Sequence, residues 1–167
     1  MKESTALEFR IATRDDCALI LSFIKMLAKY ERLEHEVVAT EQRIDEWIFD
    51  KSTAEVFFAM VDGKEIGMAL FFSNFSTFEG RAGLYLEDLF VVPEFRGRGI
   101  GTAMLRELAR IAVERGYGRM EWTCLDWNTD SIEFYLSLGA IAMDDWTNYR
   151  VTGDTLAALA ADIAKTI

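Results

Sequence analysis

Hydrophobic residues in the first 50 positions follow the spacing of helices. Between residues 14 and 31 the apolar positions recur every three or four residues, at Ile20, Phe23, Ile24 and Leu27. This spacing predicts an amphipathic helix, and Thr13 followed by Asp16 resembles a capping box with Asp in place of Glu. A strand is expected ahead of the helix, at Phe9–Ala12. Thr40 can cap a second, shorter helix that carries Ile44, Trp47 and Ile48.

The middle of the chain changes to strand-like patterns. Two apolar runs flank Asp62-Gly63, a dipeptide favoured in type I′ hairpin turns, and they predict two antiparallel strands. A further strand at Leu84–Val92 leads into a glycine-rich stretch. From Ile100 the apolar residues resume helical spacing until Gly116, which is suited to a helix C-cap.

The last fifty residues continue the same order of elements. We expect a strand over 119–125, a helix over 129–139 that ends at Gly139, a strand over 148–152 and a helix that begins at Asp154. The whole order predicts an α/β domain with a mostly antiparallel sheet and at least one crossover connection.

Length and composition place the chain among single-domain proteins. With 167 residues, 51% of them hydrophobic, it can bury one core, and a single domain over residues 1–167 is expected. No long apolar segment opens the sequence, so we expect neither a secretion signal nor a membrane span, and a cytoplasmic location. Cys17 and Cys124 lack CxxC spacing and His35 is the only histidine, so no metal is expected and the thiols are expected to be buried.

Charge narrows the range of partners. The chain has 28 acidic and 18 basic residues, for a formal net charge of −10. Such a surface repels nucleic acid and anionic membranes, and it is compatible with a cationic substrate.

Glycines at alternate positions mark the point where the strand over 84–92 meets the following helix. Gly97, Gly99 and Gly101 lie next to Arg96 and Arg98. A helix N-terminus presents backbone N–H groups and partial positive charge, which suits a phosphate or pyrophosphate. The stretch lacks the Gly-Lys-Ser/Thr of a Walker loop and the GxGxxG of a Rossmann fingerprint. It matches Arg-x-x-Gly-x-Gly instead.

This motif resembles that of the GNAT superfamily of acetyl-CoA-dependent N-acetyltransferases. Three more segments are similar, in order and spacing, to its diamine acetyltransferase branch: "LAKYE" at 27–31, "YLEDLFV" at 85–91 and "WNTDSIEFYLSLGA" at 127–140. The resemblance implies a mixed, mostly antiparallel sheet with splayed middle strands flanked by helices. It also implies acetyl-CoA as co-substrate, a small amine as acceptor and a homodimer.

The resemblance assigns a cofactor site. The pantetheine arm would lie beside Leu89, Phe90 and Val91. The pyrophosphate would bind the backbone of Arg96, Gly97, Arg98, Gly99, Ile100, Gly101 and Thr102. Asn128 and Ser131 match positions that contact the cofactor arm, although a helix N-cap explains Asn128 almost as well.

Two residues are the catalytic candidates. An alkylamine with a pKa of about 10.4 must lose a proton before it attacks a thioester, and the departing thiolate must gain one. By resemblance, Glu87 takes the first proton, directly or through water, and Tyr135 supplies the second. By strand alternation Asp88 is expected on the opposite face from Glu87. A rim charge and a packing tyrosine are the alternatives.

For the acceptor, Tyr30 and Glu31 match an element that lines the amine site in polyamine and thialysine acetylating enzymes, together with Glu87. Carboxylates beside an aromatic ring suit a polycationic amine, although a solvated helix end would show the same charges. Glu121 stands where the polyamine enzymes carry a histidine. Two further hypotheses stay open: acetylation of a protein N-terminus or amino sugar, and a non-catalytic acetyl-CoA-binding module.

Overall fold

The computed structural model describes residues 6–161. The chain divides into two compact units, one ending at Thr123 and the other beginning at Cys124. Within the described residues, no helix is long and apolar enough to cross a membrane.

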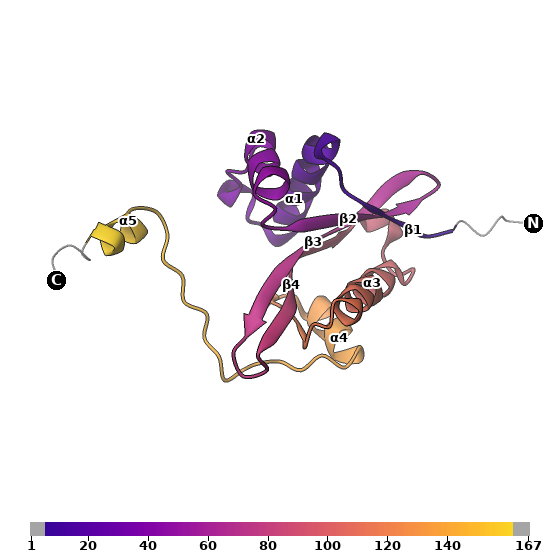
Figure 1. Ribbon diagram of the computed structural model, residues 1–167. Coiled ribbons are helices and arrows are strands. Elements are labelled where there is room, and N and C mark those ends of the chain that lie inside the picture. Colours follow the sequence, from indigo (N-terminus) through magenta and orange to yellow (C-terminus); the bar gives the residue numbers. More distant parts are fainter. Residues whose placement is uncertain (1–5, 162–167) are drawn as a thin grey trace, which may run out of the picture. The chain divides into compact units, whose positions relative to one another are not determined.

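The first unit is built on a five-stranded sheet whose strands follow chain order (Figure 1). Its strands are β1 (Glu8–Ile11), β2 (Glu55–Val61), β3 (Lys64–Ser76), β4 (Arg81–Val91) and β5 (Met120–Trp122). Neighbouring strands from β1 to β4 are antiparallel, whereas β4 and β5 are parallel. The crossover between these two runs through helix α3 (Ile100–Glu114). The prediction of a mixed, mostly antiparallel sheet flanked by helices is therefore confirmed.

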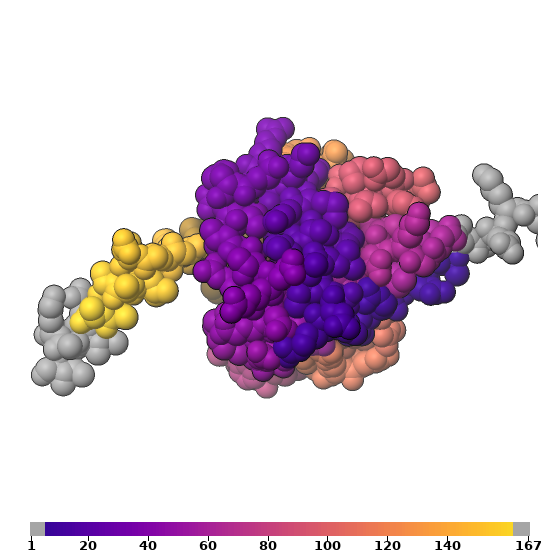
Figure 2. Space-filling view, turned by 90° about the horizontal axis from the view of Figure 1, so that it is seen from above, coloured from indigo at the N-terminus to yellow at the C-terminus, as the bar shows by residue number. Residues whose placement is uncertain are grey.

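Two helical layers enclose this sheet. Helix α1 (Cys17–Glu31) and the short α2 (Glu41–Ile44) lie on one face, where they form a continuous layer (Figures 1 and 2). Helix α3 lies on the other face (Figure 1). The core under α1 and α2 contains eight buried residues: Cys17, Ile20, Phe23, Ile44, Val56, Phe58, Met68 and Phe90. Complete burial of an aromatic or aliphatic side chain of this size contributes about 1.5–3 kcal/mol.

On the other face, a glycine allows α3 to approach the sheet closely. A Cβ atom on Gly67 would lie 2.9 Å from Met104 Sδ and 3.1 Å from the carbonyl oxygen of Phe90. The missing side chain therefore makes room for α3 directly over β3 and β4.

Several turns form as the sequence predicts. Asp62 and Gly63 have φ angles of 53° and 70°, so the turn between β2 and β3 has both central residues in the left-handed region, as type I′ requires. After α3, Gly116 has a φ of 71°, in agreement with its expected role at the helix end.

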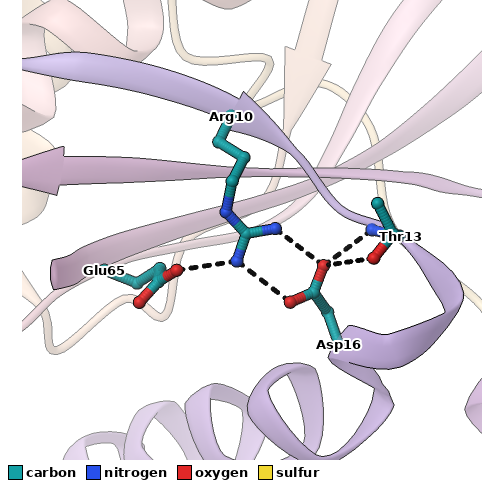
Figure 3. A network of polar contacts seen from close by, with 4 residues as sticks. All are labelled: Arg10, Thr13, Asp16 and Glu65. Carbon is teal, nitrogen blue, oxygen red and sulfur yellow. Dashed lines mark hydrogen bonds and ion pairs between the residues drawn. The ribbon is translucent and has the colours of Figure 1, made fainter. Parts of the chain in front are cut away.

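The first helix begins in a network of polar contacts (Figure 3). Residues Arg14–Asp16 form a 3-10 turn before α1. The Asp16 carboxylate accepts from the Thr13 N–H at 2.7 Å and the Thr13 hydroxyl at 3.1 Å. It also accepts two hydrogen bonds from the Arg10 guanidinium, at 2.7 and 2.9 Å, and Arg10 donates a third to Glu65 at 2.7 Å. The network joins β1, the start of α1 and β3.

The second predicted helix differs from its expected form. Thr40 does cap it, because its hydroxyl accepts from the Arg43 N–H at 3.2 Å. Regular α-helix ends at Ile44, however, and a π-helical segment follows at Asp45–Asp50. The wider turn shifts later residues from an α-helical stripe, and Trp47, which follows the buried Ile44, is 50% exposed.

The second unit contains helices α4 (Thr129–Ser137) and α5 (Gly153–Ala161). Both were expected, and Gly139 follows α4 with a φ of 89°. The strand expected over 148–152 is wrong, because this segment has no regular secondary structure. A single strand needs a partner for its backbone hydrogen bonds, and no other strand forms among the described residues of this unit.

Candidate active site

One edge of strand β4 is open beyond Leu86. Strand β5 pairs with β4 only over Leu84–Leu86, so β5 is shorter than its expected range of 119–125. The Val92 N–H donates to the Ile66 carbonyl on β3 at 2.9 Å. Because successive residues point their backbone groups to opposite edges, Leu89 and Val91 point away from β3. Within residues 6–161 no strand pairs with this part of β4, and its backbone can hydrogen-bond to an extended amide chain.

A β-bulge lies where this open edge begins. Phe71 is opposite Leu86, and Leu70 is opposite Asp88, so Glu87 is an extra residue on β4. Unbroken alternation would place Asp88 on the face of Leu86. The bulge instead places it on the face of Leu70, which packs against the core under α1. The bulge thus interrupts the alternation on which the expected opposite placement of Glu87 and Asp88 was based, and Asp88 faces helix α1.

Three carboxylates interact at this point. Burial, followed by the charges of Glu87 and Glu31, raises the pKa of Asp88 to about 6. Burial also raises the pKa of Glu31. We call Glu31, Glu87 and Asp88 the acidic cluster. Within the described part of the chain, none of the three has an ion pair or a side-chain hydrogen bond to a protein group.

The position of Glu31 at a helix end further destabilises its negative charge. Glu31 is the last residue of α1, where the helix dipole places partial negative charge. Carboxylates that lack a protein partner, and that repel one another at partial burial, are stabilised when a cation binds beside them. The acidic cluster can therefore hold an ammonium group and accept a proton from it.

Arg96 connects this region to the glycine-rich loop. Its Nε–H donates to the Val91 carbonyl at 2.9 Å. Its guanidinium carbon lies 4.7 Å from the centre of the Tyr30 ring and 5.1 Å from that of Phe90. Residues predicted separately for the cofactor and for the acceptor are thus in direct contact.

The glycine-rich loop itself is open to an anion. Gly97 and Gly99 have φ angles of 72° and 79°, and a Cβ on either would meet no atom within 4 Å. Gly99 is the N-cap of the 15-residue α3, and Ile100, the first residue of the helix, is buried. The guanidinium of Arg98 lies over the Phe95 ring, 4.9 Å from its centre. The loop therefore presents backbone N–H groups at a helix N-terminus, where phosphate binds favourably. Gly101 and Thr102 follow in the first helical turn.

The remaining candidates of the second unit lie at the start and middle of α4. Asn128 is buried and its side-chain oxygen accepts from the Ser131 N–H at 3.4 Å, so it is the N-cap of α4. Its expected contact with the cofactor arm stays a prediction. The ring centres of Phe134 and Tyr135 are 5.3 Å apart.

Glu121 is engaged by protein groups, in contrast to the acidic cluster. It accepts from the Asn74 side-chain amide at 2.7 Å, and it pairs with Arg119 at 2.9 Å. Glu121 therefore already has a hydrogen-bond donor and a cationic partner.

Comparison with known proteins identifies the family. Residues 21–140 match the Acetyltransferase (GNAT) family. The chain is 32% identical over 163 residues to a thialysine N-epsilon-acetyltransferase of Bos taurus, with 90% of this chain and 95% of the relative covered. It is 29% identical to an L-ornithine N5-acetyltransferase of Arabidopsis thaliana, with 90% and 86% covered. An integron cassette protein of V. cholerae has the same fold, with a TM-score of 0.79, 27% identity, and 94% and 99% of the two chains covered.

The chain therefore belongs to the GNAT acetyltransferase family, and it is an acetyl-transferring enzyme. The resemblance found in its sequence is confirmed, as is the expected fold.

Proposed function

We propose that this enzyme transfers the acetyl group of acetyl-CoA to a primary amine of a small acceptor that carries a second ammonium group. Diamines, polyamines and lysine analogues belong to this class. The acidic cluster beside the open edge of β4 carries the proposal. Its three carboxylates have no partner among residues 6–161, and they suit a substrate with more than one positive charge. The named substrates of two relatives, thialysine and ornithine, also carry two amino groups.

In this mechanism the chain's backbone binds the cofactor. The backbone of Leu89 and the Val91 N–H hold the pantetheine arm, since the Val91 carbonyl already accepts from Arg96. The loop from Arg96 to Thr102 holds the pyrophosphate at the start of α3. The thioester then lies near the bulge, where the amine attacks it directly in a ternary complex. Acetyl-CoA supplies the activated acyl group.

Asp88 is the proposed base. Transfer of a proton from an alkylammonium to a carboxyl of pKa about 6 is uphill by about 6 kcal/mol, against about 9 kcal/mol for a carboxyl at its ordinary pKa of 3.8. The burial and repulsion that raise the pKa of Asp88 thus lower the cost of making a neutral amine. Glu87, the base expected from the sequence, is exposed at the bulge and contributes negative charge to the cluster.

Tyr135 is the proposed acid for the departing thiolate. A phenol near pKa 10 gives its proton to a thiolate whose conjugate acid is near 8.5 at a cost of about 2 kcal/mol. Tyr135→Phe keeps the ring and removes this proton, so kcat should fall about 10²-fold while the Kd of acetyl-CoA stays unchanged. An unchanged kcat would assign another group to this step.

The proposed function is tested by the release of free thiol from acetyl-CoA over an amine panel. The panel pairs each diamine with a monoamine of equal length, and adds ornithine, thialysine, an N-terminal peptide and an amino sugar. A higher kcat/KM for the diamines and diamino acids supports the proposal. Turnover confined to the peptide or the amino sugar would overturn it and leave acetyl transfer intact.

A further inference from the structure

The guanidinium of Arg96 is held on the acceptor side of the site. It lies over the rings of Tyr30 and Phe90, with its carbon 4.7 and 5.1 Å from their centres, and its Nε–H donates to the Val91 carbonyl. No carboxylate among residues 6–161 lies within ion-pair distance of it. Three contacts with α1 and β4 thus fix a side chain that begins the glycine-rich loop.

We propose that Arg96 is a positioning residue for the amine acceptor: its guanidinium fixes the Tyr30 ring against β4 and so sets the amine site beside Glu31. This inference rests on the proposed function, because it concerns the amine that the acidic cluster binds. The Arg96 side chain acts through Tyr30, whereas the backbone of the glycine-rich loop binds the phosphates.

The chemistry of arginine accounts for this role. A planar guanidinium can stack on an aromatic ring and donate a hydrogen bond at its edge at the same time, which a lysine ammonium cannot do in the same geometry. The cation also occupies one face of the Tyr30 ring, so an acceptor ammonium cannot stack on that face. The acceptor's charge is left to the carboxylates of the acidic cluster. Tyr30 then contributes to the shape of the amine site, and the ring face that Arg96 covers does not bind the ammonium group.

Arg98 supplies a matched control. It belongs to the same loop and carries the same charge, but its guanidinium stacks on Phe95, within the 3-10 turn Pro93–Phe95 that precedes the loop. Arg98→Lys therefore changes the loop's side-chain chemistry without touching α1.

The test measures the KM of the amine, kcat and the Kd of acetyl-CoA for Arg96→Lys, Tyr30→Leu and the double variant, with Arg98→Lys beside them. We expect Arg96→Lys to raise the KM of the amine about 3- to 10-fold, the range of a partly buried cation–π contact. The Kd of acetyl-CoA should change less than about 2-fold. The KM of the amine in the double variant should be no higher than in Tyr30→Leu alone, because Arg96 is proposed to act on the amine through Tyr30. Arg98→Lys should raise the KM of the amine less than Arg96→Lys does, and any change in its Kd of acetyl-CoA measures the effect of the loop side chains on the cofactor.

Two results would overturn the inference. One is a Kd of acetyl-CoA that weakens in Arg96→Lys while the KM of the amine does not change, which would make Arg96 a phosphate ligand. The other is a KM of the amine in the double variant that rises by the product of the two single-variant increases. If Arg96→Lys does not fold, Tyr30→Leu alone decides: an unchanged KM of the amine overturns the inference. A wild-type protein that acetylates no small amine would instead overturn the proposed function.

Discussion

The carboxylates at the two ends of helix α1 have pKa values that are shifted in opposite directions. At the N-terminal end, Asp16 accepts hydrogen bonds from Arg10 and Thr13, and these contacts lower its pKa to about 2 (Figure 3). At the C-terminal end, Glu31 and Asp88 have no protein partner within the described chain, and the pKa of Asp88 rises to about 6. The difference is large enough to reverse how ionisation affects stability.

The comparison distinguishes a carboxylate that stabilises the fold from carboxylates that are suited to bind a ligand. A charged group with fixed donors stabilises the native state, and helix α1 gains further from a negative charge at its start. A charged group without donors destabilises the native state, and such groups concentrate where a substrate brings the missing partner. Asp16 and Asp88 are the same residue type, so their exchange for Asn tests the difference directly.

The largest effect is expected on catalysis. Asp88→Asn removes the proposed base and keeps the shape of the side chain, so kcat/KM for the amine should fall at least about 10²-fold at neutral pH. In the wild type, kcat/KM should fall as the pH drops below about 6, because Asp88 is then protonated. This acid limb should be absent from the variant. Steady-state rates measured between about pH 5 and 9 give both results.

Asp16→Asn is the control for this experiment. Its side chain belongs to the network of Arg10, and the folded variant should keep the wild-type kcat and the wild-type pH profile. Equal losses of kcat in both variants would mean that Asp88 acts only through the fold. Full activity of Asp88→Asn would return the role of base to Glu87.

The next effect is on stability, where the two variants should differ in sign. The pKa of Asp16 is lower in the folded state than its ordinary value of 3.8, so its contribution is present above about pH 5 and is lost as the pH falls towards about 2. The pKa of Asp88 is higher when folded, so its ionisation destabilises the protein as the pH rises from about 4 to 7. At pH 7, Asp16→Asn should lose about 2 kcal/mol of unfolding free energy and Asp88→Asn should gain a similar amount.

Denaturant unfolding of the three proteins at pH 7 and pH 3 measures this pair of effects. Both differences from the wild type should shrink at pH 3. If Asp88→Asn is less stable than the wild type at pH 7, a protein group already satisfies that carboxylate, and the comparison between the helix ends fails.

The sequence predicts those features that depend on neighbouring residues. The left-handed Asp62 and Gly63, the Thr13 and Asp16 contact and the glycine-rich start of α3 all form as expected. Each is set by local backbone preference or by a side chain a few positions away. The hydrophobic spacing likewise predicts the order of strands and helices in the first unit.

Long-range pairing determines what could not be predicted. The direction of Asp88 depends on a bulge in the pairing of β3 with β4, and one extra residue changes the face that a side chain occupies. The contact of Arg96 with Tyr30 joins residues that are far apart in the sequence. Two consecutive acids before "LFV" indicated a site, but nothing in that pattern showed that Asp88, rather than Glu87, is the partly buried one.

The smallest expected effect concerns the choice of acceptor, and it tests whether the acidic cluster binds a second ammonium. Glu31→Gln keeps the side chain's size and removes one charge at the end of α1, so the preference of kcat/KM for a diamine over a monoamine of equal length should fall about 5-fold. This loss corresponds to about 1 kcal/mol, the size of a partly exposed ion pair. The same preference should shrink in the wild type as salt increases, because the charges are then screened. Glu34→Gln is the matched control, since Glu34 is exposed on the 3-10 turn just after α1. An equal loss in Glu34→Gln would mean that general surface charge, rather than the acidic cluster, sets the preference.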